Sequence, residues 1–440
     1  MTKFSKNDYF EYNNKKITIL DFLGEGGQGA VYLVSDGNDK YAFKYYIDIP
    51  SDDFKYNLKN NIAKGSPSEN FLWPKEYIEF EDGSCGYMMD IRPSNYVSFI
   101  SYLTGKNQFK NKMTLLNWCI ELVKSFKLLH ERGYSYQDLN DGSFFFEPST
   151  GKILICDNDN VTADKRNLGV LGKMRYMAPE IVRGDIDPYT KERQMPDVHS
   201  DRFSLGIILF LALCLGNPFE GECLKKYVIV DENAEYEMFG SNPVYIFNKD
   251  NTSNRPIRGY HTAILNRYPY LPTYIKDAFH KTFVDGLTDR ENGRTTELEW
   301  IRLLCKYRDE LITCSCGKEY VYGFNEKKHN DICPYCKAKT RRFCYLNFGK
   351  SKVLLEPGKY LYESHIDKYS SNYNMPIGKV IVNKNNSELW GIKLSLDYDV
   401  LIKDSTGVER VISKSGVIPI VNHLKIKFAN NELAEIICDN

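Results

Sequence analysis

The stretch that decides the fold is Leu23-Gly24-Glu25-Gly26-Gly27-Gln28-Gly29-Ala30-Val31-Tyr32, which has the form G-x-G-x-x-G-x-V. Glycines at these spacings let backbone N–H groups approach the oxygens of a phosphate, where a Cβ would clash. Strand-like apolar residues flank the glycines at 17–23 and 31–34, and no helix is expected directly after them. A dinucleotide-binding turn needs a strand that leads into a helix. The stretch therefore predicts a glycine-rich β-hairpin that covers a phosphate.

A lysine follows in the next apolar strand, at the end of Tyr41-Ala42-Phe43-Lys44. A single lysine in such a strand usually extends its ammonium to solvent. Downstream of a glycine-rich hairpin, the favoured interpretation is instead that Lys44 lies beside the phosphates.

Two acidic loops follow. The first contains Tyr136-Gln137-Asp138-Leu139, and the second, Asp157-Asn158-Asp159-Asn160, comes directly after the apolar run Ile153-Leu154-Ile155-Cys156. Asp and Asn are common in solvated turns. A solvated turn explains neither the apolar strand before Asp157 nor the aspartate loop one hairpin earlier, so we interpret the two loops as one site.

With these motifs, residues 17–310 resemble the protein kinase superfamily. Met177-Ala178-Pro179-Glu180 resembles its A-P-E motif, and Ser200–Gly206 resembles the buried helix that follows. The resemblance implies that Asp201 holds the backbone of the catalytic loop and that Arg294 pairs with Glu180. It also implies a two-lobed α+β fold.

The resemblance implies a role for each site residue. Lys44 would hold the α- and β-phosphates of ATP, Asp138 would accept or orient the proton of the attacking hydroxyl, and Asp157 would chelate Mg²⁺ or Mn²⁺. Val31 and Ala42 would cover the adenine on one face and Phe145 on the other. The expected cofactor-binding residues are Gly24, Gly26, Gly29, Val31, Ala42, Lys44, Met89, Ser143, Phe145 and Asp157.

The expected ligands of Mg²⁺ and the expected partner of Lys44 depart from the family pattern. Ser143 stands where an asparagine normally ligates the second Mg²⁺, and a serine is a shorter and weaker ligand. Asp159 replaces a glycine and is expected to supply an extra carboxylate to Mg²⁺. The helix expected at 53–64 has asparagines but no glutamate, so Lys44 is expected to pair with an amide or with Asp157 alone.

The activation segment also departs from the pattern. Gln137 stands where an arginine normally receives a phosphate from this segment, and Thr162 and Tyr176 are the only hydroxyl residues between Asp157 and Glu180. Both features indicate activity that does not depend on phosphorylation of the segment.

Two further departures from the family pattern are interpreted as an exchange of a lysine between the catalytic loop and the activation segment. Asn140 occupies the usual position of a catalytic-loop lysine, and Lys173 occupies the position of the threonine that contacts it. We hypothesise that Lys173 is catalytic and reaches the γ-phosphate from the other side. The alternative is that the Lys173 ammonium is simply solvated.

Four cysteines form two close pairs, in Cys314-Ser315-Cys316-Gly317 and Cys333-Pro334-Tyr335-Cys336, with sixteen residues between Cys316 and Cys333. Two such loops bring four thiolates to one tetrahedral centre, as in structural zinc sites. His329 is a less favoured replacement for one thiolate. The alternative is four buried or disulfide-bonded cysteines.

The composition sets limits on the environment and partners. Lys+Arg and Asp+Glu both number 58, so no electrostatic attraction to nucleic acid or to an anionic membrane is expected. The N-terminal residues have no apolar signal-peptide core, and the apolar run Phe203–Gly216 is too short to cross a bilayer and predicts a buried helix. The chain has twelve cysteines, and most of those outside the cluster stand singly in the sequence, which favours a reducing cytoplasm.

After residue 340, short apolar runs separated by Asn, Gly, Asp and Pro turns predict an all-β sandwich-like module. Residues 355–359 and 376–380 faintly resemble forkhead-associated domains, although the Arg and Ser-Arg-x-His features of that family are not evident. We therefore expect a protein-interaction module. The predicted domains are an N-terminal extension (1–16), a kinase domain (17–312, with lobes 17–90 and 91–312), a four-cysteine zinc ribbon (313–340) and the β module (341–440).

The domain order resembles bacterial Ser/Thr-type kinases encoded beside a metal-dependent phosphatase and a von Willebrand A-type protein, which are then expected partners together with ATP and an unidentified protein substrate. Two alternatives stay open. One is a pseudokinase scaffold that binds nucleotide and acts through its C-terminal module. The other is a small-molecule phosphotransferase, which the A-P-E segment and the long helical region disfavour.

Overall fold

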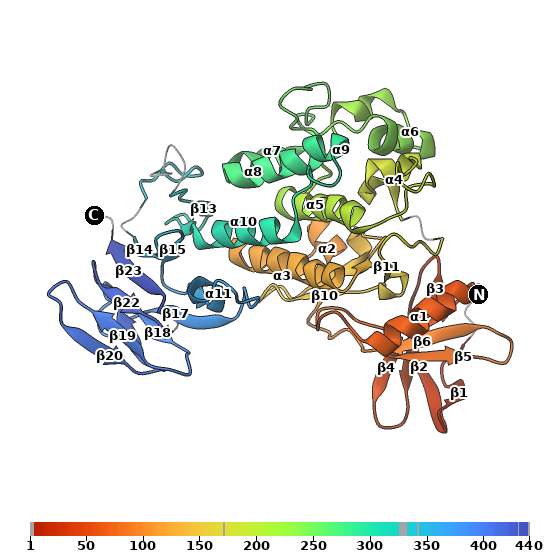
Figure 1. Cartoon of the computed structure of the whole chain (residues 1–440), viewed down its shortest axis with the longest axis horizontal. Helices are drawn as coiled ribbons and strands as arrows, with labels where there is room; N and C mark the ends of the chain where they lie inside the picture. The colour runs from red at the N-terminus through yellow and green to blue at the C-terminus, as the bar shows by residue number, and fades with distance from the viewer. Residues whose placement is uncertain (1–3, 170–171, 325–331, 341–342, 430, 439–440) are drawn as a thin grey trace. The chain divides into compact units, whose positions relative to one another are not determined.

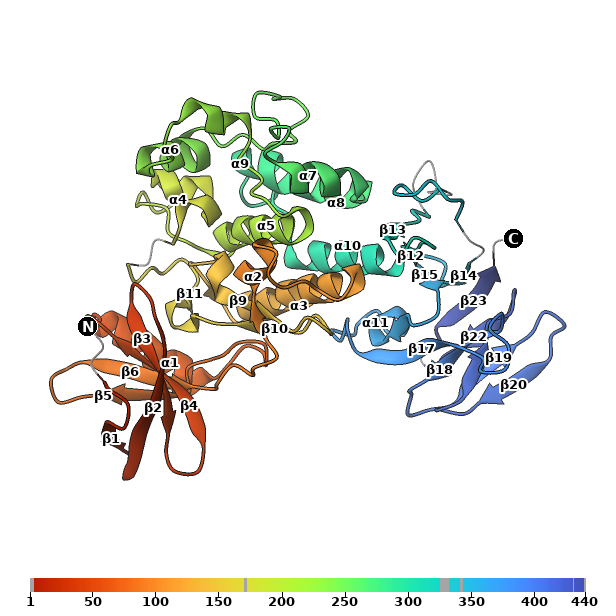
Figure 2. The same cartoon turned by 180° about the vertical axis from the view of Figure 1, so that it is seen from behind.

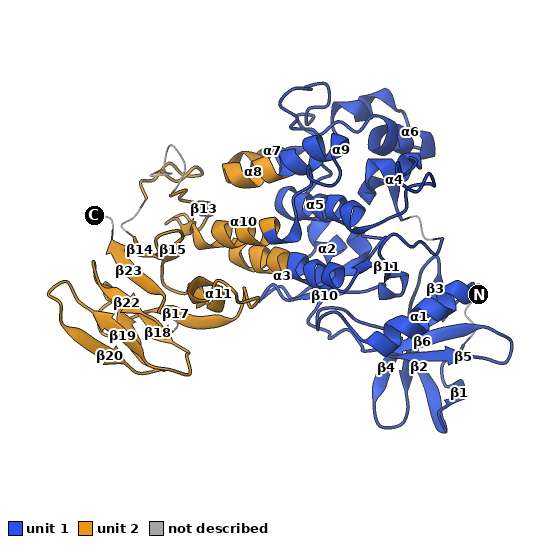
Figure 3. Ribbon diagram, in the orientation of Figure 1, with its two compact units in different colours: residues 1–110, 121–265, 279–298 blue, residues 111–120, 266–278, 299–440 orange. Residues whose placement is uncertain are grey.

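The computed structural model describes residues 4–169, 172–324, 332–340, 343–429 and 431–438. The chain forms two compact units (Figure 3). The first unit contains Met1–Lys110, Glu121–Leu265 and Phe279–Leu298, and the second contains Asn111–Ile120, Asn266–Ala278 and Glu299–Asn440.

The first unit begins with an antiparallel sheet of six strands in the order β1-β2-β3-β4-β6-β5 (Figure 1). The strands are β1 (Tyr9–Tyr12), β2 (Lys15–Glu25), β3 (Gly29–Ser35), β4 (Lys40–Tyr46), β5 (Glu76–Glu79) and β6 (Cys85–Met89). One face of the sheet buries an apolar cluster that includes Ile17, Tyr32 and Phe43.

Residues 9–12 were expected to lie in an N-terminal extension, and instead they form the edge strand β1 of this sheet. Asn13 and Asn14 both have positive φ, 52° and 61°, as a tight hairpin turn requires. Phe10 is buried in the cluster on the sheet. The Asn-Asn pair was the sequence signal for this hairpin.

Helix α1 (Asp52–Lys64) packs on the sheet beside β5 (Figures 1 and 2). The side chain of Ser51 caps its N-terminus by accepting the N–H of Phe54, and Gly65 with φ of 72° ends it. The helix buries two apolar residues, Phe54 and Leu58, together with two asparagines, Asn57 and Asn61.

The remainder of the first unit is mainly helical. Its longest buried helix is α5 (Val198–Cys214), in which every residue from Phe203 to Cys214 is buried, as the apolar run predicted. The other helices of the chain up to residue 309 are α2 (Phe99–Leu103), α3 (Lys112–Glu131), α4 (Pro179–Arg183), α6 (Glu232–Tyr236), α7 (Thr262–Arg267), α8 (Thr273–His280), α9 (Gly286–Thr288) and α10 (Glu297–Asp309). Among the described residues, no helix combines the length and the apolar character needed to cross a membrane.

Short strands frame the two acidic loops. The strands are β7 (Val97–Ser98), β8 (Tyr134–Ser135), β9 (Phe144–Phe146), β10 (Ile153–Ile155) and β11 (Thr162–Ala163). Strands β10, β9 and β7 form one sheet, and β11 pairs with β8. The Asp157 loop therefore lies between β10 and β11, and the Asp138 loop lies between β8 and β9.

The second unit contains the cysteine-rich hairpin and the β-rich C-terminal region that the sequence predicted. Strands β12 (Leu311–Thr313) and β13 (Glu319–Val321) form the hairpin. Two antiparallel sheets, β15-β14-β23-β22-β19-β20 and β16-β17-β18-β21, then share one apolar core, as in a sandwich. The strands are β14 (Cys344–Asn347), β15 (Lys352–Leu355), β16 (Tyr360–Tyr362), β17 (Pro376–Val382), β18 (Trp390–Leu394), β19 (Val400–Lys403), β20 (Glu409–Ile412), β21 (Val417–Pro419), β22 (Lys425–Lys427) and β23 (Leu433–Cys438), with helix α11 (Glu363–Ile366) after β16.

Cys344 and Cys438 form a disulfide across the paired strands β14 and β23. The two residues are 94 positions apart, so no local spacing indicated the bond. The other described cysteines outside the four-cysteine cluster are not disulfide-bonded, in line with the expectation that most of them stand singly.

Candidate active site

The glycine-rich stretch forms the turn between β2 and β3, where the N–H of Gly26 donates to the carbonyl of Gly29 at 2.9 Å. A Cβ at Gly29 would lie 2.4 Å from the carbonyl oxygen of Tyr45, so packing against β4 requires this glycine. A Cβ at Gly24, Gly26 or Gly27 would meet no protein atom within 4 Å. Packing within the protein therefore does not require these three glycines, and the space beside them is open.

Lys44 is buried on β4 and contacts two carboxylates of the second acidic loop. Its Nζ lies 2.8 Å from Oδ2 of Asp159 and 3.6 Å from Oδ1 of Asp157. The hydroxyl of Tyr46 also donates to Oδ2 of Asp159, at 2.7 Å. Asp159 is fully buried by these contacts.

These contacts correct the expectation that Lys44 pairs with an amide or with Asp157 alone. Burial by itself would lower the pKa of Lys44, but the carboxylates of Asp159 and Asp157 outweigh burial and raise that pKa above its ordinary value. Lys44 is therefore a charged ammonium held by the loop. The sequence did not reveal the pair because 115 residues separate its members.

Helix α1 contacts the same loop without any charge. Asn57 and Asn61 donate their side-chain amides to the carbonyl of Val161, at 2.8 and 2.7 Å. They are four residues apart and lie on one face of the helix. The asparagines that stood out at 53–64 thus bind the backbone just after the Asp157 loop.

Asp157 has a left-handed backbone conformation, with φ of 56° and ψ of 43°, at the start of this loop. Desolvation raises the pKa of its carboxyl; Lys44 opposes the rise, whereas the charges of Asp159 and Asp138 add to it. The hydroxyl of Tyr136 donates to the carbonyl of Cys156, the residue before Asp157, and so joins this loop to the loop that carries Asp138. The Asp157 carboxylate is partly exposed, and a carboxylate oxygen is a ligand that Mg²⁺ accepts.

The Asp138 loop is tied together by Asn140. Its amide donates to Oδ1 of Asp138 at 3.1 Å, and its Oδ1 accepts from Nζ of Lys173 at 3.2 Å. The Lys173 side chain is 58% exposed and also lies 4.0 Å from Asp141. The structure thus brings Lys173 to the catalytic loop and leaves its ammonium largely accessible.

Ser143 is fully buried, and its hydroxyl oxygen has no hydrogen-bond partner among the described residues. Its carbonyl accepts the N–H of Cys156, the residue before Asp157, at 2.8 Å. The orphaned hydroxyl next to the Asp157 strand fits the weak metal ligand expected at this position.

The residues expected around the adenine come together in one apolar cluster. Ala42 and Met89 face each other across β4 and β6. Val31 and Phe145 are partly buried against the same cluster, and the guanidinium of Arg92 lies 4.2 Å from the centre of the Phe145 ring. A partly buried apolar group of this kind suits a planar base.

Asp201 holds the catalytic loop, as predicted. Its carboxylate accepts the backbone N–H groups of Tyr136 at 2.6 Å and of Gln137 at 3.2 Å. Sequence reasoning missed His130, whose imidazole lies 3.1 Å from Asp201 and 2.9 Å from Glu297. Burial would lower the pKa of His130, but the two carboxylates raise it to about 9.

The predicted pair of Glu180 and Arg294 is also present, with two hydrogen bonds of 2.8 Å. Arg290, which sequence reasoning missed, lies 3.2 Å from Glu180 and 2.6 Å from Asp197. Burial of Glu180 would raise its pKa, but the two arginines lower it to about 2. Ion pairs between Glu180 and the two arginines thus hold the A-P-E segment in place.

Gln137, which stands at the position of the family's arginine, contacts the activation segment. It has φ of 71°, and its amide donates to the hydroxyl of Thr162 and to the carbonyl of Arg166. Thr162 is fully buried and Tyr176 is 3% exposed. A neutral amide therefore holds the segment where a phosphate and an arginine would meet in the family pattern.

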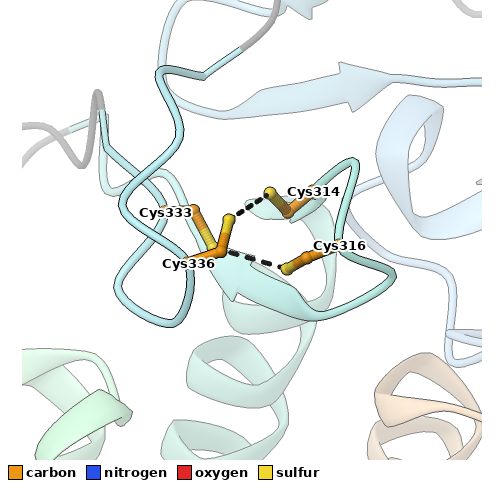
Figure 4. A group of neighbouring side chains, drawn as sticks. All are labelled: Cys314, Cys316, Cys333 and Cys336. Atoms are coloured by element: carbon orange, nitrogen blue, oxygen red, sulfur yellow. Dashed lines mark hydrogen bonds between the residues drawn. The ribbon is translucent and has the colours of Figure 1, made fainter.

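The four cysteines of the second unit converge (Figure 4). The Sγ atoms of Cys314 and Cys336 are 3.5 Å apart, those of Cys316 and Cys333 are 3.9 Å apart, and all four lie within 4.8 Å of one another. Four thiolates around one zinc ion are separated by about 3.8 Å. A backbone N–H bond from Cys316 is the main cause that lowers the pKa of Cys314 to about 6. The cluster could therefore hold a zinc ion, and His329 lies outside the described residues.

The family model described as "Protein kinase domain" matches residues 17–257, more than half of the chain. The chain belongs to the protein kinase family. Membership of this family implies ATP and Mg²⁺ as cofactors.

Among curated relatives, the kinase is 23% identical over 365 residues to "Protein kinase YegI" of Escherichia coli strain K12, covering 80% of this chain and 53% of the relative. It is 26% identical over 222 residues to "MAP kinase-interacting serine/threonine-protein kinase 1" of Xenopus tropicalis, covering 46% of this chain and 51% of the relative. The kinase thus spans about half the length of these relatives.

Proposed function

We propose that this kinase transfers the γ-phosphate of ATP to Ser or Thr hydroxyls of a protein substrate. The observation that carries the proposal is the contact of Lys44 with Asp157 beside an open glycine hairpin. The hydrogen bond from Tyr136 to Cys156 joins the Asp157 loop to the loop that carries Asp138. Lys44 would hold the α- and β-phosphates, and Asp138 would accept or orient the proton of the acceptor hydroxyl.

Asp157 and Ser143 would ligate Mg²⁺ in this proposal. The cation supplies neutralisation of charge on the transferred phosphate. The left-handed backbone at Asp157 and the orphaned hydroxyl of Ser143 support these assignments. The choice of Ser and Thr acceptors rests on relatives named as serine/threonine kinases.

A pseudokinase scaffold is the second candidate. Ser143 in place of asparagine and the absence of a glutamate in α1 favour it. The ion pair between Lys44 and Asp159 weighs against the scaffold, because it keeps the lysine charged and in place without a glutamate in α1.

Transfer of radiolabelled γ-phosphate separates the two candidates. We expect the full chain with Mg²⁺ and ATP to label itself or a generic protein acceptor, and the variants Asp138→Asn and Asp157→Asn to lose at least about 100-fold of this labelling. Intact binding of ATP with no transfer by the unaltered chain would instead establish the scaffold.

The four-cysteine cluster is proposed as a closed structural zinc site. Four cysteine ligands leave no open position on the ion, so the site would stabilise the second unit rather than catalyse. We further propose the C-terminal β module as a docking module, with a metal-dependent phosphatase and a von Willebrand A-type protein as partners. Co-purification of either with the full chain, but not with a chain that lacks residues 341–440, tests this.

A further inference from the structure

We propose that Asp159 is the positioning residue of Lys44, so that the metal loop itself supplies the carboxylate that kinases normally take from a helix. The inference rests on the proposed function, because it assumes that Lys44 holds the phosphates of ATP. It goes beyond that function by giving the two carboxylates of one loop separate roles.

Distances and exposure divide the roles of the two aspartates. Nζ of Lys44 lies 2.8 Å from Asp159 and 3.6 Å from Asp157. The Asp159 side chain is 0% exposed, whereas that of Asp157 is 55% exposed. Asp157 is therefore accessible to a cation, and Asp159 is directed into the protein toward the lysine.

Strand β4 fixes Asp159 from two positions. Lys44 and Tyr46 are two residues apart, so their side chains project from the same face of the strand. Both donate to Oδ2 of Asp159, at 2.8 and 2.7 Å. A buried carboxylate without such partners is strongly unfavourable, so the pair of donors specifies one position for Asp159 and one for the ammonium.

Helix α1 supports this arrangement through the backbone. Asn57 and Asn61 both donate to the carbonyl of Val161, two residues after Asp159. Neutral amides add no charge near Lys44, and they hold the segment that carries its partner. In this kinase, α1 thus orients Lys44 indirectly.

The competing role for Asp159 is the metal ligand that the sequence predicted. Its Oδ1 atom has no hydrogen-bond partner among the described residues, so that oxygen is the one a cation would contact. The two roles make different predictions for the variant Asp159→Asn, because only a ligand contributes to the binding of Mg²⁺.

The test compares Asp159→Asn with the matched variant Asp157→Asn. We expect Asp159→Asn to lower kcat/KM by about 100-fold, as small misplacements of a phosphate-binding group do. The factor by which Mg²⁺ strengthens binding of fluorescent ADP should remain within about threefold of the unaltered kinase, whereas Asp157→Asn should abolish this gain. An equal loss of the Mg²⁺ gain in both variants would overturn the inference in favour of a ligand role.

A second comparison uses Lys44→Met. If Asp159 acts through Lys44, adding Asp159→Asn to Lys44→Met leaves the affinity for ADP unchanged within about twofold. A further change in affinity in this background would overturn the inference. If Asp159→Asn does not fold, Tyr46→Phe removes one hydrogen bond to Asp159. We then expect a lower kcat with an unchanged Mg²⁺ gain, and an unaltered kcat would count against the inference.

These ADP measurements do not need phosphoryl transfer. If the unaltered chain transfers no phosphate, the proposed function fails, but the Mg²⁺ gain and the Lys44→Met background still decide the role of Asp159. The two failures are therefore distinguishable.

Discussion

Gly29 and Gly26 belong to the same hairpin but have different surroundings. A Cβ at Gly29 would lie 2.4 Å from the carbonyl oxygen of Tyr45, and a Cβ at Gly26 would meet nothing within 4 Å. We expect Gly29→Ala to lower the free energy of unfolding by about 1–3 kcal/mol, because the backbone of β4 must shift. Urea unfolding monitored by circular dichroism measures this loss.

Gly26→Ala is the matched control at the same hairpin. It should leave the free energy of unfolding within about 0.5 kcal/mol of the unaltered kinase and should weaken ATP binding by about tenfold, since the methyl group enters the proposed phosphate space. Equal affinity for ATP in this variant would show that the open space is not the phosphate site.

At the scale of single residues, the sequence predicted the groups that belong to short motifs. The contacts of Asp201 with the catalytic loop and the pairing of Glu180 with Arg294 are confirmed by the structure. The partner of Lys44 was not predictable, because it depends on how β4 meets a loop 115 residues later. The roles of Lys173 and Ser143 remain predictions.

His130 connects three segments of the first unit. It lies on α3 and contacts Asp201 of α5 and Glu297 of α10, and Glu297 also accepts from Arg202 at 2.8 Å. Its pKa is about 9, above the ordinary value of about 6.5 that it regains on unfolding. The charged imidazolium therefore stabilises the fold fully below about pH 6.5, and this contribution is lost as the pH rises through 9.

We expect the difference in free energy of unfolding between the kinase and His130→Gln to be of order 1–3 kcal/mol at pH 6 and to shrink toward pH 10. Urea unfolding of both proteins at pH 6, 7.5 and 10 provides the measurement. Titrating groups that do not contact His130 cancel in this difference. A difference that is constant over the range would contradict a raised pKa at His130.

The two cysteine loops are a second element with a testable role. We expect about one zinc ion per chain by native mass spectrometry and a fall in melting temperature of about 5 °C or more with a chelator. Cys316→Ser should abolish the response to chelator because it removes one ligand. Cys223→Ser lies outside the cluster and should retain the response. A chelator effect that survives Cys316→Ser would exclude this site as its origin.

Elements were predictable where one periodic pattern governs them. The run 203–216 predicted a buried helix, and α5 is buried from Phe203 to Cys214. Strand β1 was missed because its four residues carry little alternation, and only the Asn13–Asn14 turn indicates the hairpin. The Cys344–Cys438 pair depends on the strand order of the finished sheet, which no local pattern encodes.

At the scale of the whole molecule, the sequence predicted the order of a kinase domain, a cysteine-rich hairpin and a β-rich module. It did not predict the boundary between the compact units, because residues 111–120 and 266–278 of the helical region belong to the second unit. Membership of a unit follows from contacts between helices, which motif order does not contain.

Control of the whole kinase should not require phosphate on its activation segment. Gln137 already holds the segment through Thr162 and Arg166, and both hydroxyl residues between Asp157 and Glu180 are buried. We expect treatment with a broad-specificity phosphatase to leave the initial rate of transfer to a substrate unchanged within about twofold. Mass spectrometry of the segment before and after treatment is the control. A rate that falls severalfold together with loss of phosphate from the segment would refute this expectation.

The amide at Gln137 has a consequence for signalling over time. A kinase that phosphorylates its own activation segment can sustain its activity after a stimulus ends, because each active copy switches on others. A segment held by an amide offers no such feedback. If the proposed activity holds, such a kinase would keep no memory of earlier stimulation through its activation segment.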